Sequence, residues 1–206
     1  MGPGVILLAA QVVLLLAGGC ARAPHNAAAG VRLSVAIRMN GPVNDYYHYY
    51  FLIRNAADPS GQNGPIAVIL PPYLNGFATG QNAATPGFTD FVEYSRGQRQ
   101  PTSSGYGVYH LPGGMNGDPN RNVFAARGEP EYAASPHGGS LLQFELDLSR
   151  LQPSEGEPDP NNGQLPQYLQ VNIIATTTVP TDPQVPDSDK YVDAMGDQTM
   201  GSGSFN

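Results

Sequence analysis

The clearest pattern along the chain is the alternation of apolar and polar positions in three segments. Residues 31–39 (VRLSVAIRM), 140–148 (SLLQFELDL) and 169–177 (LQVNIIATT) each place apolar side chains at every second position. A period of two residues indicates a β-strand with one buried and one exposed face. We therefore predict half-buried strands at these three ranges.

A fourth segment, residues 46–54 (YYHYYFLIR), differs because both of its alternating sets are apolar or aromatic. A strand of this kind is suited to burial on both faces, so we predict a central position in its sheet. Weaker strand patterns, each bounded by Gly, Pro or Asn, occur at residues 65–70, 88–94, 106–111 and 122–126.

The patterning also decides the fold class. No window shows a sustained 3.6-residue apolar stripe, so we expect little helix, limited to short turns near 149–151 and 189–195. The lack of crossover helices excludes a parallel α/β fold. Seven or eight strands in one domain length predict an all-β fold, a single antiparallel β-sandwich with jelly-roll-like topology and long Gly- and Pro-rich loops.

Composition supports a folded chain that is interrupted by many turns. The 206 residues include 25 Gly and 20 Pro, a sum above the average share but below that of low-complexity chains. Residues 31–179 contain the predicted strands and are assigned to the sandwich. Residues 180–206 are rich in Pro and Asp, and we predict an extended tail with a disordered end.

The net charge restricts the class of partner. The chain carries a formal charge of −7 and contains no cluster of Lys and Arg. Such a surface repels a phosphate backbone, so nucleic-acid binding is not expected.

The N-terminus has the features of an export signal. Residues 5–17 (VILLAAQVVLLLA) are apolar but shorter than the about 20 residues that span a bilayer. Small residues at 17–19 then precede Cys20, the only cysteine, and this ending resembles the lipobox of bacterial lipoproteins. The resemblance implies that residues 1–19 are removed and that Cys20 is acylated. The alternative is a secretory signal cleaved near 21–23, which would discard Cys20.

Acylation would define where the protein works. Two acyl chains anchor a protein firmly, and residues 20–30, which are small and aperiodic, suit a flexible tether. The resemblance implies an extracytoplasmic position at a membrane. Ala21 after the cysteine implies the outer membrane in a cell with two membranes, whereas a cell with one membrane would hold the protein on its outer face.

The strand sequences also resemble a known group of domains. YYHYYFLIRNAADP (46–59), LLQFELDLSRL (141–151) and LQVNIIATT (169–177) are similar in layout to the carbohydrate-binding sandwich modules of family 9 and of the DOMON type. The resemblance implies a β-sandwich fold and carbohydrate as a class of ligand.

Tyrosine is abundant, with 11 residues, and its flat ring and hydroxyl suit both sugar rings and protein partners. One face of the 46–54 strand, or the loop at 71–77, is therefore a candidate binding platform. The alternative is that these aromatic side chains reflect ordinary β-propensity and pack in the core. The candidate residues are Tyr46, Tyr47, Tyr49, Tyr50, Tyr73 and Phe77.

One loop is a candidate calcium site. Residues 118–129 place oxygen-bearing side chains at positions 1, 3, 5 and 12 of an EF-hand-like loop, with Val instead of Gly at position 6. The alternative is a turn in which these side chains cap backbone N–H groups. The candidate ligands are Asp118, Asn120, Asn122 and Glu129, with Asp187, Asp189 and Asp193 as a second and weaker set. No other cofactor is expected.

Catalytic motifs are missing from the sequence, because neither a G-x-S-x-G elbow nor an S-x-x-K pair occurs. We therefore expect a noncatalytic protein. The leading hypothesis is an anchored binding module of the cell envelope whose ligand is a glycan or another envelope component. A structural or assembly role is the alternative, and a hydrolase is the third. A row of exposed tyrosines would favour binding of glycan, whereas an apolar patch or an unprotected edge strand would favour assembly.

Overall fold

The computed structural model describes most of the chain after residue 29. Contacts divide the chain into the units Met1–Gly30 and Val31–Asn206. The described residues belong to the second unit, with Gly30 as the single addition from the first. The predicted signal segment, Cys20 and nearly all of the tether lie outside it. The described residues are 30–57, 64–68, 78–79, 87–96, 102–112, 124–179, 184–190 and 192–195.

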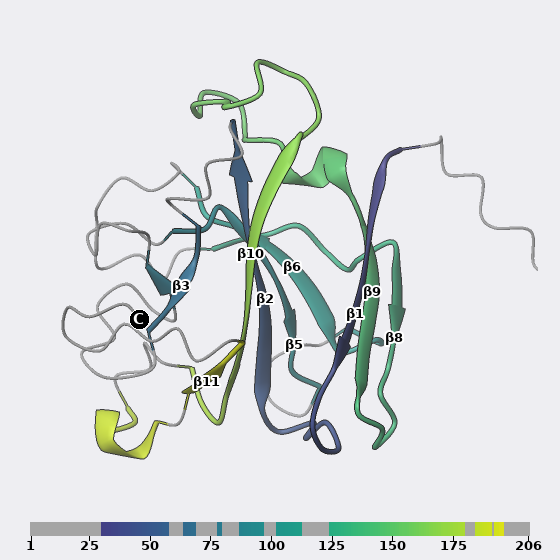
Figure 1. Ribbon diagram of the computed structural model, residues 1–206, viewed down its shortest axis with the longest axis vertical. Coiled ribbons are helices and arrows are strands. Elements are labelled where there is room, and N and C mark those ends of the chain that lie inside the picture. The colour runs from purple at the N-terminus through teal and green to yellow at the C-terminus, as the bar shows by residue number, and fades with distance from the viewer. Residues whose placement is uncertain are drawn as a thin grey trace, which may run out of the picture. The chain divides into compact units, whose positions relative to one another are not determined.

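The described residues form eleven strands in three antiparallel sheets (Figure 1). The smaller main sheet has the order β1 (Arg32–Arg38), β9 (Leu141–Asp147), β8 (Tyr132–Ala134). The larger has the order β11 (Val192–Ala194), β10 (Tyr168–Thr176), β2 (His48–Ala56), β5 (Asp90–Tyr94), β6 (Tyr106–His110), β7 (Ala125–Ala126). The third sheet consists of β3 (Ile66–Ala67) and β4 (Ala78–Thr79).

The two main sheets pack face to face and enclose the principal core. Phe51 of β2 meets Phe144 of β9 edge to face, with 5.5 Å between ring centroids. Within the smaller sheet, Val35 of β1 pairs with Phe144, so the inward sets of β1 and β9 line the same layer. The predicted all-β antiparallel sandwich is confirmed.

The larger sheet is covered on its other face as well. A second apolar cluster includes Tyr50 and Leu52 of β2 together with Phe91 of β5, and Ala67 and Ala78 of the small third sheet pack on it. Since β2 lies between β10 and β5 and is buried on both faces, its predicted central position is confirmed.

Helix is scarce in the described part of the chain, which contains only the 3-10 helices η1 (Leu148–Leu151) and η2 (Asp187–Asp189). The side chain of Asp147 caps η1 by accepting the N–H of Ser149 at 2.9 Å. No helix among the described residues has both the length and the apolar character needed to cross a bilayer.

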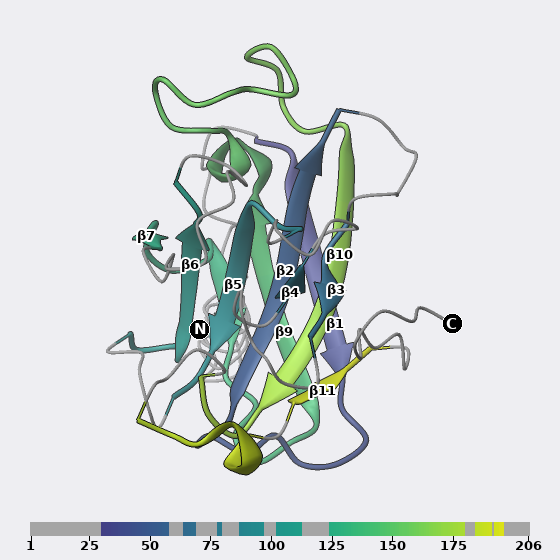
Figure 2. The same cartoon turned by 90° about the vertical axis from the view of Figure 1, so that its left-hand side faces the viewer.

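The region 189–195 differs from the expected helical turn. Val192–Ala194 forms β11, which pairs with the C-terminal end of β10 (Figure 2). The predicted tail, residues 180–206, therefore contributes an edge strand to the larger sheet. The sequence pattern did not show this strand because three residues are too few for an alternation to be seen.

Candidate functional site

The inward face of β10 is less covered than its outward face. Val171, which points inward, is 40 % exposed, whereas Ile174 on the outward face is fully buried. The cause is the unequal size of the main sheets, since the smaller one ends at β1 and leaves part of β10 without a strand opposite. An open apolar seam therefore runs between β1 and β10.

β1 is also the free edge of its sheet. The N–H of Met39 donates to Ser140 at 2.7 Å, and Val31 accepts from Leu148 at 2.9 Å, so the odd-numbered residues of this segment bond to β9. The even-numbered residues direct their N–H and C=O groups to the opposite side. No strand among the described residues pairs with that side.

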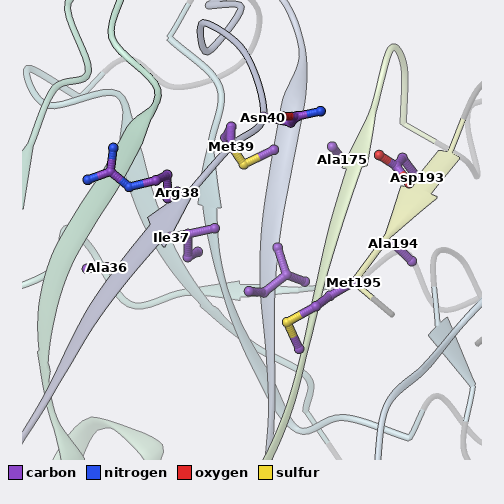
Figure 3. A pocket seen from close by; sticks show the side chains of 10 residues that line it. Ala36, Ile37, Arg38, Met39, Asn40, Ala175, Asp193, Ala194 and Met195 are labelled. Carbon is purple, nitrogen blue, oxygen red and sulfur yellow. The ribbon is translucent and has the colours of Figure 1, made fainter. Parts of the chain in front are cut away.

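A groove of about 350 Å³ lies in the seam (Figure 3). Ile37 lies on β1 and Met39 follows it, whereas Ile173 lies on β10 and Met195 follows β11. Met195 is 54 % exposed although it is apolar. The lining also includes Arg38 and Asn40 on the β1 side, and Asp193 adds one negative charge on the β11 side.

Two arginines of β1 lie on the outer face of the smaller sheet. Arg32 forms an ion pair with Glu145 at 3.2 Å. Arg38 has no ion-pair partner among the residues that the structure describes, and it points away from Met195 in Figure 3. Within the described part of the chain, the β1 rim of the seam thus carries one positive charge that forms no ion pair.

A second cluster of functional groups lies at one end of the core. The ring of His110 lies between two carboxylates, with Nδ1 2.9 Å from Asp90 Oδ1 and Nε2 2.8 Å from Glu157 Oε2. Arg127 approaches Asp90 Oδ1 at 3.5 Å and donates to the carbonyl of Gln152 at 2.9 Å. The cluster ties β5 and β6 to the segment that follows η1.

Burial and hydrogen bonding shift two pKa values in this cluster. Burial lowers the pKa of His110, but the hydrogen bonds with Asp90 and Glu157 outweigh it, so the pKa lies above its ordinary value. Burial raises the pKa of Asp90, although His110 and Arg127 oppose the shift. A protonated ring that donates to both carboxylates fits this arrangement.

The geometry of this cluster fits a structural role better than catalysis. The adjoining cavity has a volume of about 30 Å³, enough for about two water molecules at most. Both ring nitrogens of His110 are occupied, and the hydroxyl of Thr89 in the same cavity is directed to Ile53 O at 3.4 Å. Among the described residues, Asp90 Oδ2 is buried without a hydrogen-bond partner, but the cluster provides neither an available nucleophile nor space for a substrate.

The structure separates the tyrosines that were predicted to form a platform. Tyr46 is 67 % exposed and Tyr47 is 40 % exposed, whereas Tyr49 and Tyr50 lie in the core. The candidate platform on one face of the 46–54 strand is therefore limited to Tyr46 and Tyr47, which precede β2. Successive strand residues point to opposite faces, and both faces of β2 are covered. Tyr73 and Phe77 lie outside the described residues.

The structure describes only one of the four predicted calcium ligands, Glu129. Asp118, Asn120 and Asn122 lie outside the described residues. Glu129 accepts from the hydroxyl of Ser104 at 2.5 Å. No group of three or more His, Asp or Glu side chains suited to a metal ion occurs in the described part of the chain. Calcium binding stays a prediction.

Of the second acidic set, the structure describes the side chains of Asp189 and Asp193. Asp189 accepts a hydrogen bond from its neighbour Ser188 at 3.1 Å, whereas Asp193 lines the groove. The side chain of Asp187 lies outside the description.

Sequence reasoning missed both the seam and the histidine cluster. Asp90 shares the inward alternation of Val92 and Tyr94, so a carboxylate at an apolar position was the available signal. The free edge of β1 had no such signal, because strand order depends on pairing between distant segments.

Comparisons with known proteins add no family to these observations. No family model, curated protein or solved structure matches the chain.

Proposed function

We propose that this protein is a noncatalytic assembly component of the cell envelope, held at a membrane by an acylated Cys20, that binds another protein at the seam between β1 and β10. The observation that carries the proposal is a seven-residue edge strand beside an apolar groove. Main-chain groups of such an edge supply hydrogen bonds to a partner, and a neighbouring groove accepts its side chains.

The other sheet edges support the choice of β1. β7, β8 and β11 form the remaining edges of the main sheets and contain two or three residues each. Short edges are a common way to prevent unwanted pairing, whereas a long free edge offers a template for another chain. Of the edges in the described structure, β1 thus has the most unpaired backbone.

Burial of Tyr49 and Tyr50 changes the order of the functional hypotheses. The glycan-binding hypothesis depended on an aromatic platform, of which Tyr46 and Tyr47 are the exposed part. Glycan binding at this pair is the second candidate. The hydrolase hypothesis is less favoured, because the described histidine and carboxylate groups around His110 enclose no space large enough for a substrate.

The anchor would keep the seam close to the bilayer. Eleven residue steps separate Cys20 from Val31, and an extended chain spans at most about 3.5 Å per residue. The start of β1 would then lie within about 40 Å of the acyl chains, so a partner in the same membrane is within reach.

Site-specific photo-crosslinking in cells tests the protein-binding role. A benzoylphenylalanine at Ser34, which is exposed on β1, should give an adduct with one defined protein. The matched control is the same group at Tyr132, which is 46 % exposed on the opposite edge strand β8. Equal adducts at both positions, or none at Ser34, would contradict the proposal.

The remaining parts have separate tests. Fatty-acid labelling of the wild type and of Cys20→Ala should show label in the wild type only, and label in both would exclude this anchor. Polysaccharide binding that disappears in Tyr46→Ala and Tyr47→Ala, with photo-crosslinking at Ser34 absent, would favour the glycan-binding alternative.

A further inference from the structure

We infer that the seam takes an extended segment of a different protein, which adds as a strand to β1, places alternate apolar side chains in the groove and sets a carboxylate opposite Arg38. This inference rests on the proposed protein-binding function and specifies the chemistry of the partner.

The backbone of β1 determines the extended form of the partner. Arg32, Ser34, Ala36 and Arg38 each turn one N–H and one C=O to the free side. A strand placed there would form hydrogen bonds with these N–H and C=O groups at the spacing of a regular β-sheet. A helix has already used its own backbone groups and would leave them unpaired.

The side-chain pattern of the partner follows from the pleat. Residues directly opposite each other in neighbouring strands point to the same face. Partner residues opposite Ile37 would therefore point into the seam, toward Ile173 and Met195. These inward positions require apolar side chains, and Asp193 makes an inward carboxylate unfavourable at that end of the groove.

The outward-facing positions of the partner strand determine which charge the partner needs. A partner residue opposite Arg38 would lie beside its guanidinium on the outer face of the smaller sheet. Arg38 has no carboxylate partner among the described residues, whereas Arg32 already has Glu145. An acidic residue at this one position therefore complements the edge.

The same charges argue against a second copy of this chain. Symmetric antiparallel pairing of two β1 strands over all seven residues would place Arg32 of each copy opposite Arg38 of the other. Like charges directly opposite destabilise a pair of strands. Each copy also carries a formal charge of −7, which adds a general repulsion.

Peptide binding to the full chain in lipid nanodiscs tests the inference by fluorescence anisotropy. The probe is a labelled nonapeptide of alternating valine and threonine in which glutamate replaces one threonine. A second peptide carries lysine at that position, and a third has its bonding amides N-methylated. We expect the glutamate peptide to bind about fivefold more tightly than the lysine peptide, as for an exposed ion pair, and the N-methylated peptide not to bind.

Variants of β1 separate backbone pairing from adsorption to the groove. Ala36→Pro removes an outward N–H without removing a bond to β9, so it should abolish binding, whereas Ala36→Thr keeps the N–H and should bind normally. Arg38→Glu should reverse the preference between the glutamate and lysine peptides. Circular dichroism would show that each variant is folded.

The outcomes distinguish the proposed protein binding at the seam from the inferred chemistry of the partner strand. Peptide binding that is insensitive to N-methylation and to Ala36→Pro would overturn strand addition. A dimer in sedimentation that Ala36→Pro dissociates would identify a second copy as the occupant and overturn the inference. Adducts at Ser34 in cells together with no peptide preference would leave the proposed protein binding standing and reject this partner chemistry.

Discussion

Glu157 Oε2 lies 2.8 Å from Nε2 of His110, and this contact joins the segment after η1 to the end of β6. The same carboxylate oxygen accepts the N–H of Ser154 at 2.8 Å, so Glu157 holds both its own turn and the sheet. Glu157 is therefore one of the side chains that hold the segment after η1 against the larger sheet, together with Asn55 and Asn161.

Replacement of Glu157 by Gln should weaken the attachment of the segment after η1 to β6. The pKa of His110 is raised, and the loss of the carboxylate charge weakens the hydrogen bond to its ring. Hydrogen bonds to charged groups contribute about 1.5–3 kcal/mol to the free energy of unfolding. Hydrogen exchange of amides 152–166 should accelerate about tenfold or more, while the exchange of β2 stays unchanged. Glu155→Gln, at an exposed position of the same turn, is the matched control and should leave the exchange as in the wild type.

The stability of the fold should decrease as the pH rises above about 6.5. The folded state raises the pKa of His110 from 6.5 and that of Asp90 from 3.8, so it binds both protons more tightly than the unfolded state. Stability from such groups is fully present below the unfolded pKa and is lost as the pH passes through the folded pKa. Urea unfolding between pH 5 and 9 measures this loss.

Two variants identify the source of the pH dependence. His110→Gln should lower the stability and flatten its decrease above pH 6.5. His137→Asn, which changes an exposed histidine at a position with φ of 47°, should retain the wild-type slope. A stability that increases between pH 6.5 and 8.5 in the wild type, and not in His110→Gln, would show that the sign assigned to His110 is wrong.

The alternation of β9 predicts that substitutions on its two faces differ greatly in their effect on stability. Phe144 is 2 % exposed and meets the rings of Phe51 and Tyr106, so Phe144→Ala should cost about 3–5 kcal/mol in unfolding free energy. Leu141 is 37 % exposed on the other face, and Leu141→Ala should cost about 0.5 kcal/mol. Similar losses in chemical denaturation would contradict the register of β9.

A short hydrogen bond fastens the turn that leads into β2. The hydroxyl of Tyr94 donates to Asp45 Oδ1 at 2.5 Å, and burial together with this carboxylate raises the pKa of Tyr94. Tyr94→Phe should therefore lower the unfolding free energy by about 1.5–3 kcal/mol, the range for bonds to charged groups. Tyr46→Phe is the control at an exposed ring and should unfold as the wild type does; an unchanged Tyr94→Phe would show that the bond is absent in solution.

The strands were predictable where burial imposes a period on the sequence. The alternation in 31–39 and 140–148 corresponds to β1 and β9, which pair over seven residues and bury Val35 against Phe144. The doubly apolar segment at 46–54 corresponds to β2, which is covered on both faces. Each of these properties is local to one segment, and a local pattern is sufficient to show it.

The candidate site was not predictable in the same way. An edge strand and a central strand can have the same alternation, so the free side of β1 follows only from the pairing of segments more than a hundred residues apart. The distribution of tyrosines failed for a related reason. Tyr46 and Tyr49 lie close together in the chain, but only the second lies within a covered strand.

The open seam should also be detectable without any partner. Val171 and Met195 expose apolar surface beside the groove, and contiguous exposed apolar surface binds hydrophobic dyes. Val171→Lys should reduce the fluorescence of bound anilinonaphthalene sulfonate and change the unfolding free energy by less than about 1 kcal/mol, because the site is already solvent-accessible. Tyr168→Lys, equally exposed on the opposite face of β10, should leave the dye signal unchanged. A large loss of stability in Val171→Lys would mean that another part of the molecule covers this residue, and the seam would then be closed in solution.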